Sequence, residues 1–276
     1  MDKRWTRTQT RLTVAAFAAL HLAVLLVVFA PPTAALVALA VASYGVRMFG
    51  VTAGYHRYFS HRAYKLGRAA QFLMACLAQT SGQKGVLWWA AHHRDHHKHS
   101  DREDDVHSPR HGFWWAHAGW VLSDQFDDYE PRRIADFGRF PELCWLDRFY
   151  WVPPAVLAVA LAAGGLDLFV WGFVVPTVCL YHATFAINSV AHVWGTRRFE
   201  TRDDSRNNFL LALLTLGEGW HNNHHYCMSS ARQGVRWWEV DITYVALRAL
   251  SAIGVVRDLR PFVIHGAARA AQGRAA

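Results

Sequence analysis

Two pairs of long apolar segments dominate the pattern of hydrophobic and polar positions. Residues 12–30 contain no Lys, Arg, Asp or Glu, and residues 33–54 contain one charged residue. Residues 149–166 and 168–189 form a second pair, separated by a single acidic residue. A helix needs about 20 apolar residues to cross a bilayer. The pattern therefore predicts an all-α membrane protein with four transmembrane helices in two hairpins.

Proline and glycine mark the turns of both hairpins. Pro31-Pro32 separates the first two segments, and residues 164–167 (Gly-Gly-Leu-Asp) separate the last two. Pro153-Pro154 and Pro176 lie inside the third and fourth segments, where proline removes a backbone donor, so we expect bends there. Arg47 lies near the end of the second segment, from where its side chain could reach the membrane interface.

The charge distribution predicts the orientation. All of the 29 Lys and Arg residues except Arg47 lie in residues 1–11, 55–148 or 194–276. Positive charge marks the cytoplasmic side, so we expect both termini in the cytoplasm, together with a helical cap formed by residues 55–148 and 190–276. The basic residues flank apolar segments and form no single stripe, which argues against nucleic acid as a partner. We expect residues 1–276 to form a single domain.

Two further apolar stretches are not expected to cross the membrane. Residues 69–79 are too short to span it comfortably and are interpreted as interfacial or re-entrant. Residues 235–256 are interrupted by charges, and their pattern predicts an amphipathic helix lying along the membrane. The four cysteines form no C-x-x-C pair, which suits a reducing compartment.

Histidine carries the candidate chemistry. The chain has 17 histidines, and imidazole is a good ligand for transition metals. One zinc ion would use only three or four of those that cluster near the apolar segments. The clustered set therefore predicts two metal ions bound almost wholly by nitrogen. Its members are His56, His61, His93, His96, His97, His192, His221, His224 and His225.

The spacing within each cluster indicates how the ligands meet. Histidines at positions i, i+3 and i+4 project from one face of a helix. We therefore expect the cluster of His93, His96 and His97 to present three nitrogens to one place, and the His221 cluster to do the same. His56 and His61 fit a helix end that opens into a turn. His192 follows the fourth span, and Asn188, one turn earlier, could reach a metal directly or through water.

Other residues near the clusters are assigned supporting roles. His92 is the alternative to His93 if the helix has a different register. His21 and His182 lie in apolar segments and are interpreted as packing residues. Metal-bound imidazoles need partners for their second nitrogen. The candidates for this role are His107, His111, His117, Asp95, Asp101, Asp104, Asp105 and Glu218.

Several enzyme classes are excluded by missing motifs. Soluble di-iron bundles use Glu-x-x-His twice, whereas this chain has one match, beginning at Glu218. Signatures of serine hydrolases, P-loops and dinucleotide-binding loops are absent.

Four motifs carry a resemblance to a known family. They are His-Arg-Tyr-Phe-Ser-His (56–61), His-Arg-Asp-His-His-Lys (93–98), Asn-Ser-Val-Ala-His (188–192) and Gly-Glu-Gly-Trp-His-Asn-Asn-His-His (217–225). In order and spacing the chain resembles the integral-membrane acyl-CoA desaturases of the stearoyl-CoA, delta-9 type. The similarity covers about residues 33–258.

The resemblance implies an activity and a set of ligands. The nine clustered histidines would bind two irons, with Asn188 beside one of them through water. The reaction would be the O₂-dependent desaturation of a long saturated acyl thioester, with acyl-CoA expected and a cis double bond usually at carbon nine. An unactivated methylene offers no acid, base or electrophilic group, so a strong oxidant is needed, and zinc has no redox chemistry.

Candidate substrate contacts are fewer. Tyr44 and Met48 precede His56 by about three turns and could close an apolar tunnel, or could serve as ordinary packing residues. Trp88 and Trp89 could line its mouth or lie in an aromatic belt. Animal relatives read Trp-Ala-Arg-Asp where this chain has Trp-Ala-Ala-His (89–92), so Lys84 is the remaining candidate cation for the coenzyme A head.

The resemblance also requires a source of electrons. Residues 259–276 are a short tail rich in Arg and Ala, so electrons are expected from a separate cytochrome b5-like protein or ferredoxin. The basic residues Arg197, Arg198, Arg202 and Arg206 could dock such an acidic carrier or contact membrane lipid. Two alternatives remain: a fatty acyl or alkane hydroxylase on the same scaffold, and a membrane metal transporter.

Overall fold

The computed structural model describes residues 3–264, which are mostly helical. Two short strands, β1 (Lys65–Leu66) and β2 (Val256–Arg257), pair antiparallel with Lys65 opposite Arg257. The α-helices are α1 (Lys3–Ala23), α2 (Ala34–Phe49), α3 (Arg68–Gln79), α4 (Val86–His99), α5 (Ala135–Gly138), α6 (Pro141–Arg148), α7 (Val152–Ala163), α8 (Leu166–Phe169), α9 (Val175–Ser189), α10 (Phe209–Leu214), α11 (His221–Tyr226) and α12 (Ile242–Ala252).

Wider and tighter helical segments extend or connect these helices. The π-helical segments are η2 (Gly50–Ser60), η4 (Trp115–Gly119) and η8 (Val170–Val174). The 3₁₀ segments are η1 (Val24–Val28), η3 (Pro109–His111), η5 (Trp120–Leu122), η6 (Asp124–Phe126), η7 (Pro131–Ile134) and η9 (Val190–His192).

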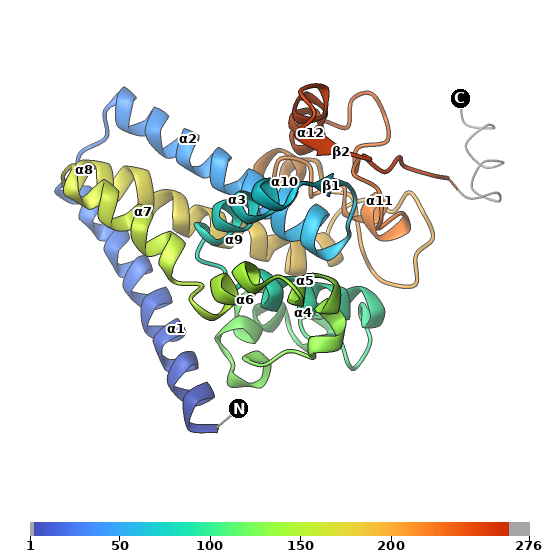
Figure 1. The fold of residues 1–276 in the computed structure, drawn as a ribbon, viewed down its shortest axis with the longest axis horizontal. Coiled ribbons are helices and arrows are strands. Elements are labelled where there is room, and N and C mark those ends of the chain that lie inside the picture. Colours follow the sequence, from blue (N-terminus) through green and yellow to red (C-terminus); the bar gives the residue numbers. More distant parts are fainter. Residues whose placement is uncertain (1–2, 265–276) are drawn as a thin grey trace.

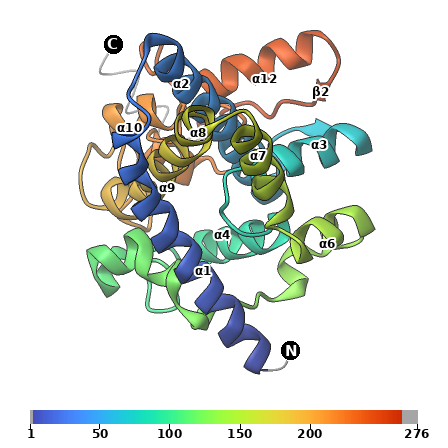
Figure 2. The same cartoon turned by 90° about the vertical axis from the view of Figure 1, so that its left-hand side faces the viewer.

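The apolar helices extend together from one side of the molecule. Helices α1, α2, α7 and α9 run toward the left of Figure 1, and α3, α4, α6, α10, α11 and α12 gather on the other side. Within the described residues, three continuous helices are long and apolar enough to cross a membrane: Thr10–Val28, Ala34–Ser60 and Leu166–His192. The first of these helices has no buried residue in its most apolar part. It lies across the outside of the other helices in Figure 2.

The third predicted span differs from the expectation for residues 149–166. Helix α7 covers only Val152–Ala163, and with α6 it passes the same test as a pair bent by 63°. Pro153 and Pro154 lie in the first turn of α7, where missing backbone donors start a new helix instead of bending a continuous one. The described residues therefore contain three candidate spans, or four if the bent pair counts as one.

The second and fourth apolar helices run further than the predicted segments 33–54 and 168–189. The second helix continues through η2 to Ser60. The fourth begins at Leu166 and reaches His192 through η8, α9 and η9. Pro176 lies in the first turn of α9, directly after η8, so the widened turn accommodates the residue that lacks a backbone N–H.

The side chain of Arg47 does not reach the membrane interface, contrary to the expectation from the sequence. Only 2% of its surface is exposed. Its guanidinium donates to the carbonyl of Thr80 from Nε at 3.1 Å and Nη2 at 2.7 Å, and it lies over the ring of Phe173. Arg47 thus links the second apolar helix to the turn after α3.

The cap packs around the end of the second apolar helix. Helices α3 and α4 both contact η2, and α6 contacts both of them. Residues 69–79 form most of α3, whose inner face buries Met74 and Ala78 against this core. The helix expected over residues 235–256 is shorter: α12 begins after Asp241, whose carboxylate accepts from the amide of Tyr244 and caps the first turn.

Candidate metal centre

Nine imidazoles meet at the junction of the apolar helices and the cap, and they form two groups. The five-histidine cluster contains His56, His61, His93, His97 and His224. The four-histidine cluster contains His96, His192, His221 and His225. Within each group the candidate ligand nitrogens all lie within 4.8 Å of one another. These are the nine histidines singled out from the sequence.

The π-helical segment η2 explains how His56 and His61 reach the same cluster. Its backbone bonds run from residue i to residue i+5, and the amide of His61 donates to the carbonyl of His56 at 3.2 Å. A spacing of five residues therefore places both rings on one side of the widened turn, with centroids 4.8 Å apart. The helix ends at Ser60 and His61 lies in the turn that follows, in agreement with the helix end expected from the sequence.

Helices α4 and α11 each supply ligands to both clusters, which corrects the prediction that each histidine triplet points to one place. His93 and His97 belong to the five-histidine cluster, whereas His96 joins the other. On α11, His221 and His225 face the four-histidine cluster and His224 faces away from it. Residues i and i+4 lie close together around the helix axis, whereas residue i+3 is displaced to the other side of residue i. This displacement directs the middle histidine of each triplet to the other cluster.

The distances between ring nitrogens fit ligands of one ion. The Nε2 atom of His224 lies 3.0 Å from those of His56 and His97, and Nε2 of His93 lies 3.0 Å from that of His97 and 2.9 Å from that of His61. Nitrogens bound at right angles about 2.1 Å from a metal would lie about 3.0 Å apart. A ring nitrogen has one hydrogen or one lone pair, so mutual hydrogen bonds cannot satisfy this network.

The four-histidine cluster shows the same fit. The Nε2 atoms of His192 and His221 are 3.0 Å apart. The Nε2 atoms of His96 and His225 are buried and have no hydrogen-bond partner. Buried polar atoms without partners are costly, and a bound cation would satisfy both. The donors are all imidazole nitrogens, a set that suits iron, copper, nickel or zinc.

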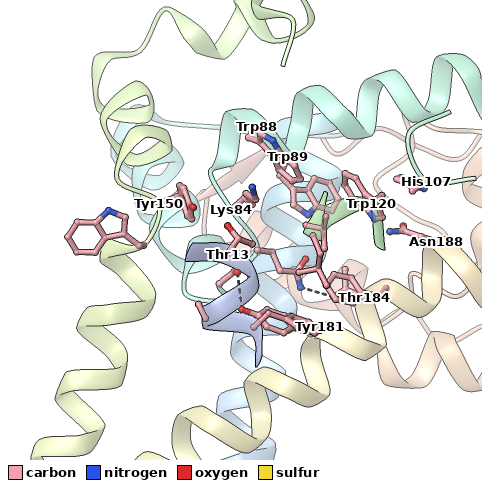
Figure 3. A pocket seen from close by; sticks show the side chains of 18 of the residues that line it. Thr13, Lys84, Trp88, Trp89, His107, Trp120, Tyr150, Tyr181, Thr184 and Asn188 are labelled. Carbon is pink, nitrogen blue, oxygen red and sulfur yellow. Dashed lines mark hydrogen bonds between the residues drawn. The ribbon is translucent and has the colours of Figure 1, made fainter. Parts of the chain in front are cut away.

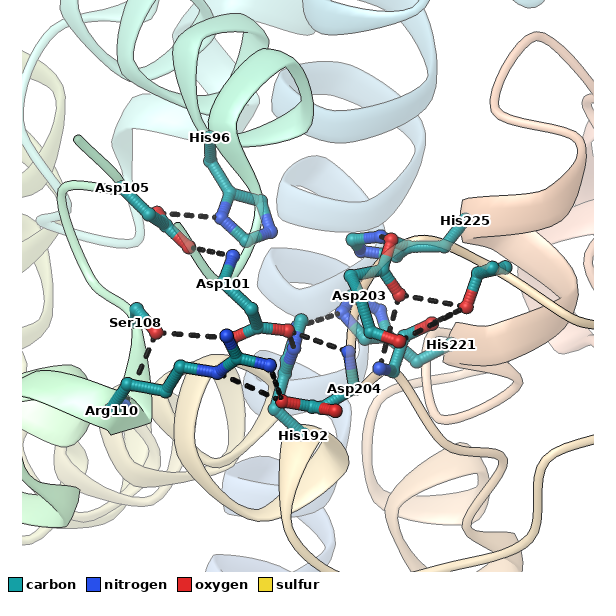
Figure 4. Close-up of polar contacts among 12 residues, drawn as sticks. His96, Asp101, Asp105, Ser108, Arg110, His192, Asp203, Asp204, His221 and His225 are labelled. Atoms are coloured by element: carbon teal, nitrogen blue, oxygen red, sulfur yellow. Dashed lines mark hydrogen bonds and ion pairs between the residues drawn. The ribbon is translucent and has the colours of Figure 1, made fainter. Parts of the chain in front are cut away.

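Carboxylates hold the outer nitrogens of four ligands. Asp105 accepts from Nδ1 of His96 at 2.9 Å, Asp101 from His192 at 2.7 Å and Asp203 from His225 at 2.9 Å, as Figure 4 shows. Nδ1 of His56 lies 2.5 Å from Glu218. A hydrogen on Nδ1 leaves the Nε2 lone pair free, so these bonds fix the tautomer that binds a metal.

Burial and mutual repulsion favour the neutral imidazoles. Burial lowers the pKa of His93, His97 and His224 well below the ordinary value, and the neighbouring imidazoles lower it further. Burial also lowers the pKa of His96, but the carboxylate of Asp105 reverses this, so that the pKa lies above its usual value. Neutral imidazole is the form that binds metals.

A buried arginine stabilises the far side of the five-histidine cluster. Arg57 is 1% exposed, and its guanidinium contacts Glu218 at 2.9 Å and Asp241 at 2.9 Å. Burial raises the pKa of Glu218, but the charges of His56 and Arg57 lower it to about 2. Gln233 donates to Glu218 at 2.7 Å. This network connects the candidate ligand His56 to the first turn of α12.

An apolar cavity of about 350 Å³ leads to the clusters. His107 and Asn188 lie at one end and Lys84 and Tyr150 toward the other, as Figure 3 shows, and His93 is also a lining residue. The walls come from segments far apart in the chain: α1, the loop before α4, α4, η5, the start of α7 and α9. Asn188 therefore lies where the cavity meets the ligands.

The predicted substrate contacts divide into two groups. Trp88 and Trp89 line the cavity, and the ring of Trp89 stacks on His93 at 4.9 Å. Lys84 also lines it, but its ammonium is buried in an ion pair with Asp127 at 2.6 Å. Tyr44 and Met48 are not among the lining residues; the hydroxyl of Tyr44 donates to the carbonyl of Leu214 at 2.6 Å.

The other histidines among residues 3–264 lie outside the two clusters. His92 packs against Trp88 and Trp120, so His93 is the residue of this pair that faces the ligands. His107 stacks on His96 with ring centroids 4.1 Å apart. His21, His182 and His117 form a hydrogen-bonded chain with contacts of 3.0 Å, which ends at the hydroxyl of Ser189. His111 is exposed.

The structure also places residues at the site that the sequence did not indicate. Asp203 supports His225 from a loop with no motif of its own, and Arg57 lies between two predicted ligands but faces the opposite way. Asp95 pairs with Arg133 and lies near His99 instead of a ligand. Of these residues, only Arg57 could have been found from the sequence. A charged residue inside the end of an apolar helix needs a buried partner.

Comparison with known proteins places this geometry in context. A family model described as fatty acid desaturase matches residues 31–257. The chain is 39% identical over 217 residues to the chloroplastic palmitoyl-monogalactosyldiacylglycerol delta-7 desaturase of Arabidopsis thaliana, covering 77% of this chain and 58% of that protein. It is 39% identical over 218 residues to the icosanoyl-CoA 5-desaturase of Limnanthes douglasii, covering 77% and 61%.

A cyanobacterial relative is similar over a comparable length. The sn-1 stearoyl-lipid 9-desaturase of Synechocystis sp. is 37% identical over 219 residues, covering 76% of this chain and 67% of that protein. The chain thus spans about three fifths of the length of the two plant proteins. The three names give different positions of the double bond and include both lipid-linked and CoA-linked acyl groups.

Proposed function

The chain belongs to the fatty acid desaturase family, and on this premise we propose that it removes two hydrogens from a long saturated acyl chain to leave a cis double bond at carbon nine. The co-substrate is O₂, and two irons are the cofactor. The expected substrate is an acyl-CoA thioester. The reaction consumes two electrons and two protons besides O₂, and releases two waters.

One observation carries this proposal. Nine imidazoles form two adjacent clusters, and one of them, His93, lines an apolar cavity. A paraffin chain has no group that a general acid or base can activate, so its oxidation requires a strong oxidant held beside it. Two bound irons supply that oxidising power from O₂, which zinc cannot do.

The residues of the chain hold and orient the reactants. The nine Nε2 atoms would bind the two metals, and Asp101, Asp105, Asp203 and Glu218 keep four of those rings in position. The amide of Asn188, which lines the cavity, would hold a water beside one of the metals. Burial of an acyl chain against Trp88, Trp89 and the α1 wall excludes bulk water from the site and is worth about 0.8 kcal/mol per CH₂.

The position of the double bond would be set by distance. If the polar head stays near Lys84 and Tyr150, the number of carbons between that end and His93 determines which methylenes face the metals. Tyr44 and Met48 remain candidates for contacts with the far end of the chain, beyond the cavity described above.

A lipid-linked acyl group is the second candidate substrate. Lys84, the candidate contact for coenzyme A phosphates, already pairs with the buried Asp127, which compensates its charge. A neutral or zwitterionic lipid head needs no such cation. Assays with stearoyl-CoA and with a distearoyl lipid in the same detergent distinguish the two substrates.

The membrane arrangement proposed here has four spans, with α6 and α7 together forming the third. Both termini, the cap and the metal centre lie on the cytoplasmic side. The positive charges outside the apolar helices support this orientation. Ligand clusters at helix ends also suit an enzyme better than a metal transporter, whose sites lie near the bilayer midplane.

Electrons would arrive from a separate carrier protein with acidic charge, such as cytochrome b5 or a ferredoxin. Arg197 and Arg202 are exposed close to Asp203, which supports His225. Arg198 is less available because it pairs with Glu239. An exposed basic surface over the four-histidine cluster offers a short route for electron transfer.

The proposal is tested by expressing the chain in a host that lacks unsaturated fatty acids and profiling lipids by mass spectrometry. Monounsaturated chains from the native protein but not from His224→Ala support desaturation. Hydroxylated chains would instead favour a hydroxylase on the same scaffold. Metal analysis adds a separate criterion, because readily exchangeable zinc and no iron would favour the transporter.

A further inference from the structure

Buried negative charge is shared unequally between the two histidine clusters. Three of the four carboxylates bonded to a ligand imidazole support the four-histidine cluster, and one supports the other cluster. The ligand nitrogens themselves are alike in both clusters, since all belong to imidazole. Any electrostatic difference between the two metal positions therefore comes mainly from groups outside the ligands.

The three carboxylates around the four-histidine cluster are buried. The side chains of Asp105, Asp101 and Asp203 are 0%, 1% and 11% exposed. The other hydrogen bonds to these carboxylates come from neutral donors: backbone amides donate to all three, and the hydroxyls of Ser108 and Thr201 donate to Asp101 and Asp203. Two exposed arginines lie nearby without contacting these carboxylates: Arg197 donates to the backbone carbonyl of Asp203 at 2.7 Å, and Arg110 pairs with Asp204.

The charge of the single carboxylate of the five-histidine cluster is partly compensated by an arginine. Glu218 contacts Nδ1 of His56 at 2.5 Å and the guanidinium of Arg57 at 2.9 Å. Arg57 in turn contacts Asp241, on the side away from the ligands. A second arginine, Arg94, donates to the carbonyl of Ser60 near His61 and pairs with Asp136.

Fixed charges of this kind change the relative stability of metal oxidation states. Coulomb interactions are strong where water is excluded. A carboxylate bonded to the outer nitrogen also makes a metal-bound imidazole a stronger electron donor. Each effect stabilises a trivalent ion more than a divalent one, and each is larger where three uncompensated carboxylates surround four ligands.

We propose that Asp101, Asp105 and Asp203 make the four-histidine cluster the site that retains Fe³⁺ when the centre takes up its first electron. This inference rests on the proposed di-iron function. The first electron from a one-electron donor reduces Fe³⁺ to Fe²⁺ at the five-histidine cluster. The second electron reduces the iron held by His96, His192, His221 and His225.

A redox titration of the purified, iron-loaded protein tests this order. The oxidised protein is titrated with dithionite, and Mössbauer spectra of ⁵⁷Fe record the ferric and ferrous fractions at each point. We expect two one-electron steps. In Asp203→Asn and in Asp105→Asn, the second step should become easier by at least about tenfold in its equilibrium constant, or about 59 mV, while the first step stays in place.

Glu218→Gln is the matched variant for the other cluster, and it should move the first step and leave the second in place. If the two aspartate variants move the first step, or if neither step responds to them, the assignment is wrong. Should Glu218→Gln fail to fold, the two aspartate variants compared with the native protein still decide the order.

Protein that binds two irons and forms monoenes but shows the opposite order refutes only this inference. Protein that binds no iron refutes the proposed function.

Discussion

The Nε2 atoms of His56 and His224 lie 3.0 Å apart, although 168 residues separate the two positions in the chain. His56 comes from the π-helical end of the second apolar helix and His224 from α11 in the cap. Their contact closes the five-histidine cluster and joins the apolar helices to the C-terminal part of the cap. Loss of either ring should therefore affect metal binding before it affects the rest of the fold.

Replacement of His224 by alanine should remove one ligand from the five-histidine cluster. We expect desaturation to fall by at least about 100-fold, since even partners of ligands contribute 10- to 100-fold. After dialysis against a chelator, about one iron per chain should remain. His111→Ala is the matched control, because His111 is exposed and outside both clusters. Full activity in His224→Ala would show that this ring is not a ligand.

Replacement of Arg57 by methionine should destabilise the protein strongly. Glu218 and Asp241 would keep their buried charges without the guanidinium that contacts both. Breaking a buried ion pair from one side costs about 3–5 kcal/mol. Unfolding in mild detergent, followed by tryptophan fluorescence, measures the loss. Arg68→Met removes an exposed pair with Glu142 and should leave the transition unchanged. Equal effects of the two variants would contradict the role given to Arg57.

A larger side chain on α1 should obstruct the cavity without disturbing the metals. Ala16 lines the cavity, whereas Ala15 is exposed and is not a lining residue. Ala16→Trp should reduce activity on stearoyl substrates by at least about tenfold, because an acyl chain loses burial worth about 0.8 kcal/mol per CH₂. Iron content should stay the same. Similar loss in Ala15→Trp would point to a general disturbance of α1.

Exchange of iron for zinc should separate folding from chemistry. Zinc binds imidazole nitrogen readily but has no redox states. The zinc-loaded protein should unfold at a temperature close to that of the iron-loaded protein and well above that of the metal-free protein, because ligand binding stabilises the folded state. It should form no unsaturated product. Product formation at the native rate by a zinc-loaded, iron-free sample would exclude the proposed redox mechanism.

The sequence was sufficient to single out the nine clustered histidines but not their distribution between clusters. Nine histidines at short spacings indicated two metal positions, and the structure brings the same nine together. Their division depends on the direction in which α4 and α11 cross the site, and spacing alone cannot provide that direction. The continuation of the second helix to Ser60 was also missed, because a π-helical turn has no strong local sequence signal.

Other features depended on contacts between distant segments. Glu218 and Asp105 were recognised as candidate partners because they lie within or close after histidine motifs, whereas Asp203 lies in a loop whose position is set by packing. The start of the helix in the third span could not be placed, because Pro153 is compatible with both a bent helix and a new helix. The pairing of Lys84 with Asp127 joins the loop before α4 to a segment 43 residues away.

Helix α4 contributes His93 and His97 to one cluster and His96 to the other. The gap between the two metal positions is therefore fixed by a single helical turn, whose backbone hydrogen bonds resist stretching. If the protein moves when an acyl chain enters or leaves, the two metal positions must move together. The movement must then occur in the opposite wall of the cavity. Helix α1 can provide it, because no residue in its most apolar part is buried.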